Sequence, residues 1–226
     1  IDVNMEDLEE LHTQISEVLG PAAANFIVAY RQGGPFDGAG EGQPPESVTI
    51  DLRQPARVPL TTILDLIGQR TRVVLPGEAQ ATIIESAFPD GPIAMAVYLP
   101  EMMDHLSVNP DPVIPGRINI NQASRTILSG IPDLSDTALE QILSSRDLEV
   151  IPERPSRRHE TWLLIEGVVT LDEMKSLMRF VNAGGDVYRF QAVGYFDQEG
   201  ATARAEVLLD ATSTAPKLLQ WRDLSH

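Results

Sequence analysis

The chain has 226 residues and a formal net charge of −16, because 33 aspartates and glutamates outnumber 17 lysines and arginines. The length allows one large domain or two small ones, and an ordinary hydrophobic fraction of 42% excludes wholesale disorder. Cysteine is absent, which excludes disulfides, thiolate metal sites and cysteine nucleophiles. The negative net charge disfavours nucleic-acid binding. Salt at physiological concentration screens charges over ~8 Å, however, so a local basic patch would matter more than the net charge.

Two features bear on the membrane. No apolar run approaches the ~20 residues that a membrane-spanning helix needs, and no signal peptide is present. Because the chain begins at Ile1 rather than Met, we expect a truncated form, in which a missing anchor says nothing about the native N-terminus.

The first predicted unit is a pair of helices at the start of the chain. Asn4 and Asp7 suit the first turn of a helix from about Met5 to Val18. Gly20 and Pro21 then turn the chain, and Pro21 can occupy the first position of a second helix. Two short helices joined by a tight turn make a helix-hairpin-helix.

A turn-rich loop over residues 33–45 follows. As a phosphate-binding loop it is poor, because it follows no strand, opens no helix and includes an acid, so we expect a flexible linker. Residues 47–52 alternate enough to predict a short strand, with residues 72–75 as its partner. Between them, apolar residues over 60–67 recur at helical spacing, and Gly68 can end that helix.

A further helix is predicted over residues 92–106, with Pro100 expected to kink or split it. Residues 109–115 hold three prolines and predict a rigid connector into a central hairpin.

The central hairpin spans residues 118–146. Asn121 can cap its first helix, and Pro132 forces a turn after Gly130. Ser135 can cap a second helix, whose apolar residues share one face. These residues are Ala138, Leu139, Ile142 and Leu143.

The central hairpin repeats the first one in sequence. The matched positions are Ile1-Asp2-Val3-Asn4 with Ile118-Asn119-Ile120-Asn121, Leu11 with Leu128, and Leu19, Ala23, Ile27 and Arg31 with Leu134, Ala138, Ile142 and Arg146. The first copy has two extra residues in its turn. Such self-similarity indicates a unit used twice to build one core, because a single hairpin cannot bury its own apolar face.

A connector over residues 151–159 carries a cluster of basic residues, Arg154, Arg157, Arg158 and His159. We expect a solvated loop or an internal counter-charge rather than a phosphate site. A short helix over residues 161–166 should end at Gly167. Thr170 and Glu173 then have the spacing of a capping box, so the helices around Gly167 resemble a third, degenerate hairpin.

After Gly185 the period changes from helical to two. Val187, Arg189, Gln191 and Val193 alternate with Tyr188, Phe190, Ala192 and Gly194. Residues 197–200 form a predicted turn, residues 202–209 a returning strand, and residues 217–221 a third strand. In the turn, Asp197 and Glu199 could offer oxygens to calcium, although most acidic turns are simply solvated.

Enzyme chemistry has no support in the spacing of residues. We find no Walker loop, no metalloprotease or hydrolase motif and no dinucleotide fingerprint, and the four histidines lie far apart in sequence. A hydrolase using an acidic cleft would gain weight only if carboxylates converge in a deep pocket.

The hairpin turns provide a test of DNA binding. Hairpins of this type that bind DNA present Gly-hydrophobic-Gly at the turn, so that bare backbone N–H groups can approach a phosphate. The second copy has Asp133, Leu134 and Ser135 there, and Asp133 puts negative charge where the phosphate would lie. The first copy keeps Gly20, but Pro21 has no N–H. DNA binding through either turn is therefore disfavoured.

The elements together predict an α+β fold: a mostly helical body with repeated helix-hairpin-helix units and a small C-terminal antiparallel sheet. We expect either two domains, 1–110 and 111–226, or one continuous domain.

On these residues the chain resembles protein K of type II secretion, the general secretion pathway, a family of minor pseudopilins. The resemblance covers residues 1–31 and about 116–226. Its most telling parts are 116–124 with its hairpin and the C-terminal segments 162–164, 187–195 and 221–223. It is weak over residues 33–106, and the hairpin alone is shared with DNA-binding proteins of the competence type.

The resemblance implies a non-enzymatic assembly protein that binds other minor pseudopilins or secretion components at the tip of a short pseudopilus. It implies the periplasmic side of the inner membrane, with an N-terminal apolar helix, absent here, as the only membrane contact. It implies no cofactor other than the calcium that some members bind, and no calcium ligand can be transferred residue by residue. The alternative function is a DNA-binding module of the competence type.

Overall fold

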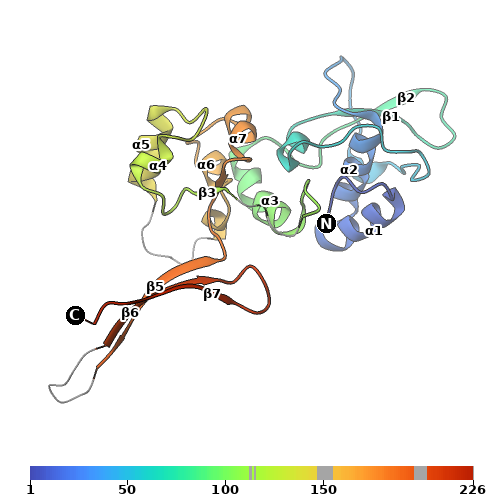
Figure 1. The fold of residues 1–226 in the computed structure, drawn as a ribbon. Helices are drawn as coiled ribbons and strands as arrows, with labels where there is room; N and C mark the ends of the chain where they lie inside the picture. Colours follow the sequence, from blue (N-terminus) through green and yellow to red (C-terminus); the bar gives the residue numbers. More distant parts are fainter. Residues whose placement is uncertain (112–113, 115, 147–154, 196–202, 226) are drawn as a thin grey trace. The chain divides into compact units, whose positions relative to one another are not determined.

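The computed structural model describes residues 1–111, 114, 116–146, 155–195 and 203–225 (Figure 1). It has the predicted α+β fold, with helices, short strands and a C-terminal antiparallel sheet. Its contacts define a helical unit, residues 1–112 and 116–183, and a sheet unit, residues 113–115 and 184–226. Among the described residues, no helix combines the length and apolar character needed to cross a bilayer.

The elements of the helical unit are α1 (Leu8–Leu19), α2 (Pro21–Gly33), the 3₁₀ helices η1 (Pro45–Ser47) and η2 (Ile63–Leu66), β1 (Thr71–Val74), β2 (Ala81–Ile84), α3 (Pro92–His105), β3 (Ile118–Asn119), α4 (Arg125–Leu128), α5 (Asp136–Ser145), the 3₁₀ helix η3 (Pro155–Arg158), α6 (Trp162–Ile165), α7 (Leu171–Leu177) and β4 (Val181–Asn182). Those of the sheet unit are β5 (Val187–Gly194), β6 (Ala203–Asp210) and β7 (Lys217–Asp223).

The first helix pair, α1 and α2, begins later than its sequence suggests. Asp7 is the N-cap of α1, and its carboxylate accepts hydrogen bonds from two backbone N–H groups of the first turn. Asn4 lies before the helix and bonds to Leu60 instead, donating to its carbonyl and accepting from its N–H, both at 2.9 Å. Asn4 therefore joins the start of the chain to the segment that precedes η2.

The loop over residues 33–45, predicted as a flexible linker, instead covers both edges of a hairpin. β1 and β2 pair antiparallel, and the loop bridges to β1 at Pro35 and to β2 at Gln43. The linker prediction is wrong because this loop supplies the hydrogen-bond partners that the two short strands would otherwise lack at their outer edges.

Glycine lets this loop lie close to the hairpin. Arg70 donates hydrogen bonds to the carbonyls of Gly38, at 2.8 Å, and Gly40, at 3.0 Å. A Cβ on Gly33 would lie 2.4 Å from the carbonyl oxygen of Arg72, so no larger residue fits there without a backbone shift. The glycines, which suggested mobility in the sequence, allow close packing.

The strand predicted over residues 47–52 does not form, and β1 pairs with β2 rather than with this segment. The backbone carbonyls of this segment accept hydrogen bonds from side chains of α2 instead. Asn25 donates to the carbonyl of Val48, at 3.0 Å, and Gln32 donates to that of Asp51, at 2.8 Å. The segment alternates in sequence because alternate side chains enter the core, not because it belongs to a sheet.

The next two predicted helices differ in their outcome. In place of the helix expected over 60–67, the structure has the single 3₁₀ turn η2. A capping box of Thr62 and Asp65 begins this turn, and Gly68, at φ 64°, comes just after it. The helix α3 agrees with its prediction, and Pro100 lies inside it without splitting it.

In the second helix pair, Asn121 is not the cap of the first helix. α4 begins at Arg125, after Ser124. The Asn121 side chain donates a hydrogen bond to the carbonyl of Ala183, at 2.7 Å, and accepts one from the indole N–H of Trp162, at 3.1 Å. It therefore joins this hairpin to α6 and to the end of β4. α5 begins as predicted, at its Ser135 cap.

The two predicted copies make matching hydrogen bonds at their start. Asp2 and Asn119 each accept a hydrogen bond from the N–H two residues later, at 2.9 and 3.0 Å. Each segment then pairs with a later one, because Val3 donates to Ser107 and Ile120 to Asn182, both at 2.9 Å. The pairing is parallel in both copies.

An arginine at the end of the second helix completes each copy. Arg31 donates to the carbonyl of Val3, and Arg146 donates to the carbonyl of Ile120. These arginines are one of the pairs matched in sequence. Each arginine thus connects the end of the second helix of its hairpin to the segment at the start of the same copy.

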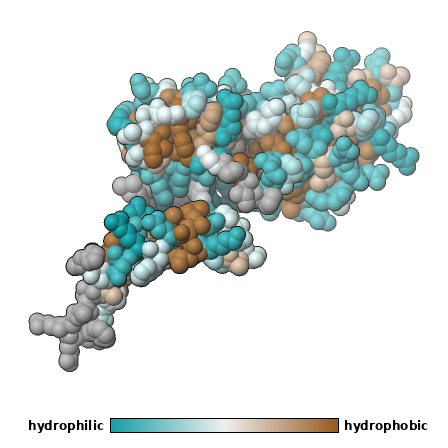
Figure 2. Space-filling model, viewed as in Figure 1, coloured by the Kyte–Doolittle hydropathy of each residue, from teal (hydrophilic) through white to brown (hydrophobic). Residues whose placement is uncertain are grey.

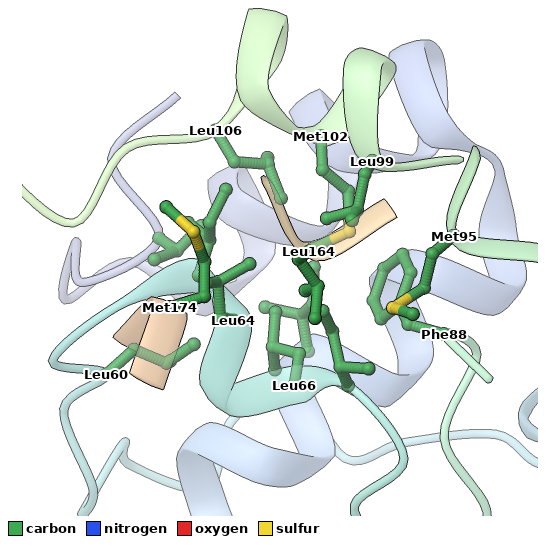
Figure 3. Packing of buried hydrophobic residues seen from close by; sticks show 14 of the residues in the cluster. Leu60, Leu64, Leu66, Phe88, Met95, Leu99, Met102, Leu106, Leu164 and Met174 are labelled. Carbon is green, nitrogen blue, oxygen red and sulfur yellow. The ribbon is translucent and has the colours of Figure 1, made fainter. Parts of the chain in front are cut away.

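The capping box predicted at Thr170 and Glu173 opens α7, and Gly167, at φ 71°, lies in the turn before it. α6, α7, α3 and η2 meet in the core of the helical unit (Figure 3). The labelled side chains come from both predicted halves: Leu60, Leu64, Leu66, Phe88, Met95, Leu99, Met102, Leu106, Leu164 and Met174. The contacts divide the chain near residue 184 rather than near residue 110 because residues on both sides of 110 share this core.

Candidate docking surface

The three C-terminal strands form a sheet in the order β5-β6-β7, all antiparallel, as the period-two pattern predicts. Phe190 lies opposite Val207, and Val207 lies opposite Trp221. Arg189 lies opposite Leu208, and Leu208 opposite Gln220. Since side chains of directly opposed residues point to the same side of a sheet, these two rows lie on opposite faces.

The first row belongs to a face that is almost wholly apolar, which we call the apolar face. Its apolar residues are Tyr188, Phe190, Ala192, Gly194, Ala203, Ala205, Val207, Leu209, Leu218 and Trp221, and its one charged residue among the paired positions is Asp223, at the end of β7 opposite Ala205. The side chains of Tyr188, Phe190, Leu218 and Trp221 are between 46% and 59% exposed. Figure 2 shows apolar atoms gathered on the sheet beside polar ones.

No helix of the sheet unit covers this face among the described residues, since all three of its elements are strands. A sheet with one apolar face is stable when another layer packs on that face. Exposed apolar patches of this kind mark interaction sites in soluble proteins. The aromatic residues, with their large apolar area and few rotatable bonds, are the types that dominate binding energy at protein interfaces.

A hollow of about 220 Å³ lies at one end of the apolar face. The small residues Ala192, Gly194, Ala203 and Ala205 line it together with Trp221, and the polar residues Arg204, Asp223 and Ser225 complete its lining. Small side chains in two neighbouring strands leave room for one large side chain of a partner to enter beside the indole ring.

The opposite side, which we call the ionic face, carries a row of alternating charges. Arg189 Nη2 lies 2.6 Å from Glu206 Oε2, and this hydrogen bond lowers the pKa of the Glu206 carboxyl, to which Arg222 also contributes. Asp210 accepts hydrogen bonds from Thr212, which lower its pKa. A second hollow, of about 330 Å³, lies over Arg189, Glu206, Leu208 and Gln220. The charged residues are therefore concentrated on the ionic face, which also carries Val187, Val193 and Leu208, and the aromatic residues of the strands are all on the apolar face.

The turn of the first hairpin has the backbone expected for its residues. Gly20 has φ 88°, and Pro21 is the first residue of α2. Gly20 is the N-cap and makes no side-chain cap bond, and Pro21 brings no N–H. This helix start therefore has one backbone N–H fewer to offer a phosphate.

The turn of the second hairpin contains the one non-glycine residue with positive φ among the described positions, Asp133, at 63°. It stands where DNA-binding hairpins have their first glycine. Pro132 precedes it, Leu134 is half-buried, and the Ser135 hydroxyl accepts a hydrogen bond from the N–H of Ala138, at 3.1 Å. The turn therefore has the backbone conformation that glycine favours, but it carries the carboxylate of Asp133. The N–H of Ala138 is already bonded to the Ser135 hydroxyl.

The three described members of the basic cluster pair with carboxylates of the same chain, which agrees with one of the two expected roles, an internal counter-charge. Arg157 makes two 2.7 Å bonds to the carboxylate of Glu166, and its guanidinium lies 4.8 Å from the centre of a tryptophan ring. Arg158 pairs with Asp104, and His159 Nε2 lies 2.9 Å from Asp104 Oδ1. Burial lowers the pKa of His159. Arg154 lies outside the described residues.

The calcium candidates Asp197 and Glu199 also lie outside the described residues. Within the described part of the chain, no three acidic or histidine side chains gather closely enough to hold a metal ion. The hollows of the two sheet faces are lined by one carboxylate each, Glu206 and Asp223.

Sequence reasoning identified the strands of the surface but missed the register that forms it. Period two separates Tyr188 and Phe190 from Arg189 within β5, yet it does not say which residues of β7 share their side. The register shift between Leu208 and Leu209 decides that, because it brings both Leu218 and Trp221 onto the apolar face. Comparison of the chain with protein-family models, with curated proteins and with solved structures finds no match.

Proposed function

We propose that the chain is a non-enzymatic assembly protein, similar to a minor pseudopilin of type II secretion, that docks partner subunits through the apolar face of its sheet. The observation that supports this is the apolar face itself, with Tyr188, Phe190 and Trp221 exposed on one side of a sheet whose other side carries most of its charged residues. The resemblance to protein K of type II secretion supplies the class of assembly.

The polar side chains of the helical unit also support the proposal. Its conspicuous polar side chains are used internally, as in the Arg157–Glu166 pair and in Asn121, which links α6 and β4. A body of this kind suits a rigid platform that carries a docking surface. Under this proposal the protein works on the periplasmic side of the inner membrane, and its partners are other minor pseudopilins.

The test measures the affinity of the chain for the periplasmic domains of the other minor pseudopilins of its own secretion system. Phe190→Ser and Trp221→Ser each remove a large side chain from the centre of the apolar face. We expect each to weaken binding by at least tenfold in calorimetric titration, because buried aromatic residues at interfaces contribute about 2 kcal/mol or more.

The matched control is Val193→Ser, on β5 like Phe190 and similarly exposed, but on the ionic face. It should bind as the unmodified chain does. Far-ultraviolet circular dichroism of each variant, which reports the backbone and does not depend on the aromatic side chains removed, checks that the sheet is retained. Undiminished binding by both aromatic variants, or an equal loss in Val193→Ser, would contradict the proposal.

A further inference from the structure

The free edge of β5 is a second feature of the sheet unit, separate from its faces. In the order β5-β6-β7, β5 is an edge strand, and its described residues pair only with β6 (Figure 1). The N–H of Ala211 donates to the carbonyl of Asp186, at 2.7 Å, so Asp186 and every second residue after it face β6. The N–H and C=O groups of the residues between them therefore point outward, and these residues are Val187, Arg189, Gln191 and Val193.

The two edges of the sheet are protected to different degrees. β7 has a register shift in its pairing with β6 and carries Lys217, Arg222 and Asp223, which are devices that hinder strand addition. β5 pairs with β6 over eight residues without a shift, and contains no proline and no lysine. Its one charged residue is Arg189. β5 is therefore the edge open to a further strand.

We propose that β5 takes the β5 strand of a second copy of this chain, paired antiparallel about a twofold axis at Phe190, so that two sheets join into one. In this register Arg189 of each copy lies opposite Gln191 of the other, and Val187 opposite Val193. All four outward residues then exchange backbone hydrogen bonds with the second copy.

The side chains of β5 fit this register. Phe190 meets Phe190 on the axis, and Tyr188 lies opposite the small Ala192, so the apolar faces of the copies become continuous. Aromatic and β-branched cross-strand pairs stabilise antiparallel strands by about 0.2–1 kcal/mol each. No like charges oppose one another.

The neighbouring registers are worse. Centring the pair on Arg189 sets two arginines directly against each other and leaves Val193 without a partner in β5. Centring it on Gln191 leaves Val187 opposite Tyr195, which lies beyond the end of the strand. The sequence of β5 therefore favours one register over those on either side.

Net charge sets the salt dependence of this contact. Each copy carries a formal charge of −16, so two copies repel each other at low salt. Added salt screens that repulsion and leaves the backbone hydrogen bonds in place. The dimer should therefore strengthen as salt is raised, whereas an interface of ion pairs would weaken.

The register is tested by single cysteines, because the chain has none of its own. In the proposed pairing the two copies of residue 190 form a non-hydrogen-bonded pair with Cα atoms about 4.5 Å apart, within the range of a disulfide. Phe190→Cys should form a disulfide-linked dimer under mild oxidation. The matched control is Ala192→Cys, whose two copies would be displaced by four residues along the strands, roughly 13 Å, and should stay monomeric.

The contact itself is tested by sedimentation equilibrium of the full chain at rising salt. We expect the mass to approach twice 24.7 kDa at submillimolar concentration. Gln191→Lys should weaken the dimer severalfold, since it opposes Arg189 of the second copy, while within its own sheet the lysine lies opposite Glu206 and the fold is retained. The control Gln220→Lys makes the same change on the same face of β7 and should have no effect.

A chain that stays monomeric under all conditions overturns the proposal, as does equal cross-linking of the two cysteine variants. Equal effects of Gln191→Lys and Gln220→Lys would also overturn it, because the contact would then not run along β5. Gln191 lies outside the apolar face, so its variant should still bind the pseudopilin partners proposed above. The two proposals can thus fail separately.

Discussion

Arg31 is a buried cation whose side-chain hydrogen bonds go to backbone carbonyls, while the carboxylate of Asp2 favours its charged form. The residue is only 5% exposed. Its guanidinium donates hydrogen bonds to the backbone carbonyls of Val3, Asn4 and Val58. Burial lowers its pKa. Through these bonds the guanidinium connects α2 to residues 3–4 and to Val58, and its counterpart Arg146 likewise donates to backbone carbonyls of the second copy.

Replacing Arg31 with methionine should lower the free energy of unfolding by about 3 kcal/mol, because several buried carbonyls would lose their donor. Urea denaturation followed by circular dichroism measures this. The exposed Arg53→Met serves as the control and should change stability by no more than about 0.5 kcal/mol. Equal stabilities of the two variants would show that the Arg31 bonds do not support the fold.

Asp133 is held in a conformation that glycine adopts more readily, at φ 63°. Asp133→Gly should therefore raise the free energy of unfolding by about 0.5–1 kcal/mol, despite the greater freedom of glycine in the unfolded chain. Asp133→Ala removes the same charge without relieving the backbone and should be less stable than the glycine variant in thermal denaturation. The reverse order would mean that charge, not backbone, governs this turn.

At the scale of elements, the helix ends were the most predictable part of the fold. Ser135 caps α5 and the Thr170–Glu173 box opens α7, because these are local bonds between residues close in sequence. The errors have a common cause in distant contacts. Asn121 was expected to cap a helix but bonds to Ala183 and Trp162 instead, and the segment 47–52 gives its carbonyls to α2. No local pattern reports such partners.

Glu173 gives the capping box a pH dependence. Hydrogen bonds from the N–H and hydroxyl of Thr170, at 2.7 and 2.9 Å, lower the pKa of its carboxyl from 4.5. The ionised form is therefore favoured by folding, and its contribution is complete at neutral pH and lost as the pH falls through the pKa of the folded state.

Glu173→Gln should accordingly lower the melting temperature at pH 7, and the difference from the unmodified chain should shrink as the pH falls below 4.5 and vanish once it is below the lowered pKa of the folded carboxyl. Melting curves across this range provide the measurement. Asp172→Asn, in the same first turn but without a cap bond, is the matched control. A difference that persists unchanged at low pH would show that the carboxylate charge is not what matters.

The candidate docking surface was predictable in part at the same scale. Alternation along β5 is enough, by itself, to separate Phe190 from Arg189. The charged residues of β6 and β7 likewise indicate the ionic face. The register shift at Leu208 and Leu209 joins Leu218 and Trp221 to the apolar face, and a shift of this kind depends on pairing that one strand alone does not specify.

At the scale of the whole molecule, the two units differ in how they are stabilised. Every apolar residue that is fully buried among the described residues belongs to residues 1–183. The sheet unit has no such core, so its stability rests on strand pairing and on whatever covers its apolar face.

A chain shortened to residues 1–185 should therefore unfold with the same midpoint as the full chain, within about 2 °C, because it keeps the whole core of the helical unit. Far-ultraviolet circular dichroism during heating measures this. Removal of residues 1–3 is the contrasting variant, since it deletes the strand that pairs near Ser107, and it should melt earlier. A large loss of stability on removing the sheet unit would contradict the division.

The charge of the whole chain and the chemistry of both turns predict weak interaction with DNA. Asp133 places a carboxylate at one turn and Pro21 removes an N–H at the other. In a gel-shift series at low salt, duplex DNA should not be retarded at micromolar protein. Retardation that disappears steeply with added salt would favour the competence-type alternative.

The strand pairs that close the two copies also bear on biosynthesis. The first copy closes on itself when Ser107 reaches Val3, while the second closes only when Asn182 reaches Ile120. A nascent chain can thus complete its first loop while the later helices are still being made. Until α6 and α7 are in place, Leu64 and Met102 lack the side chains that cover them in the folded core, and in this interval the incomplete chain should be open to aggregation or to a chaperone.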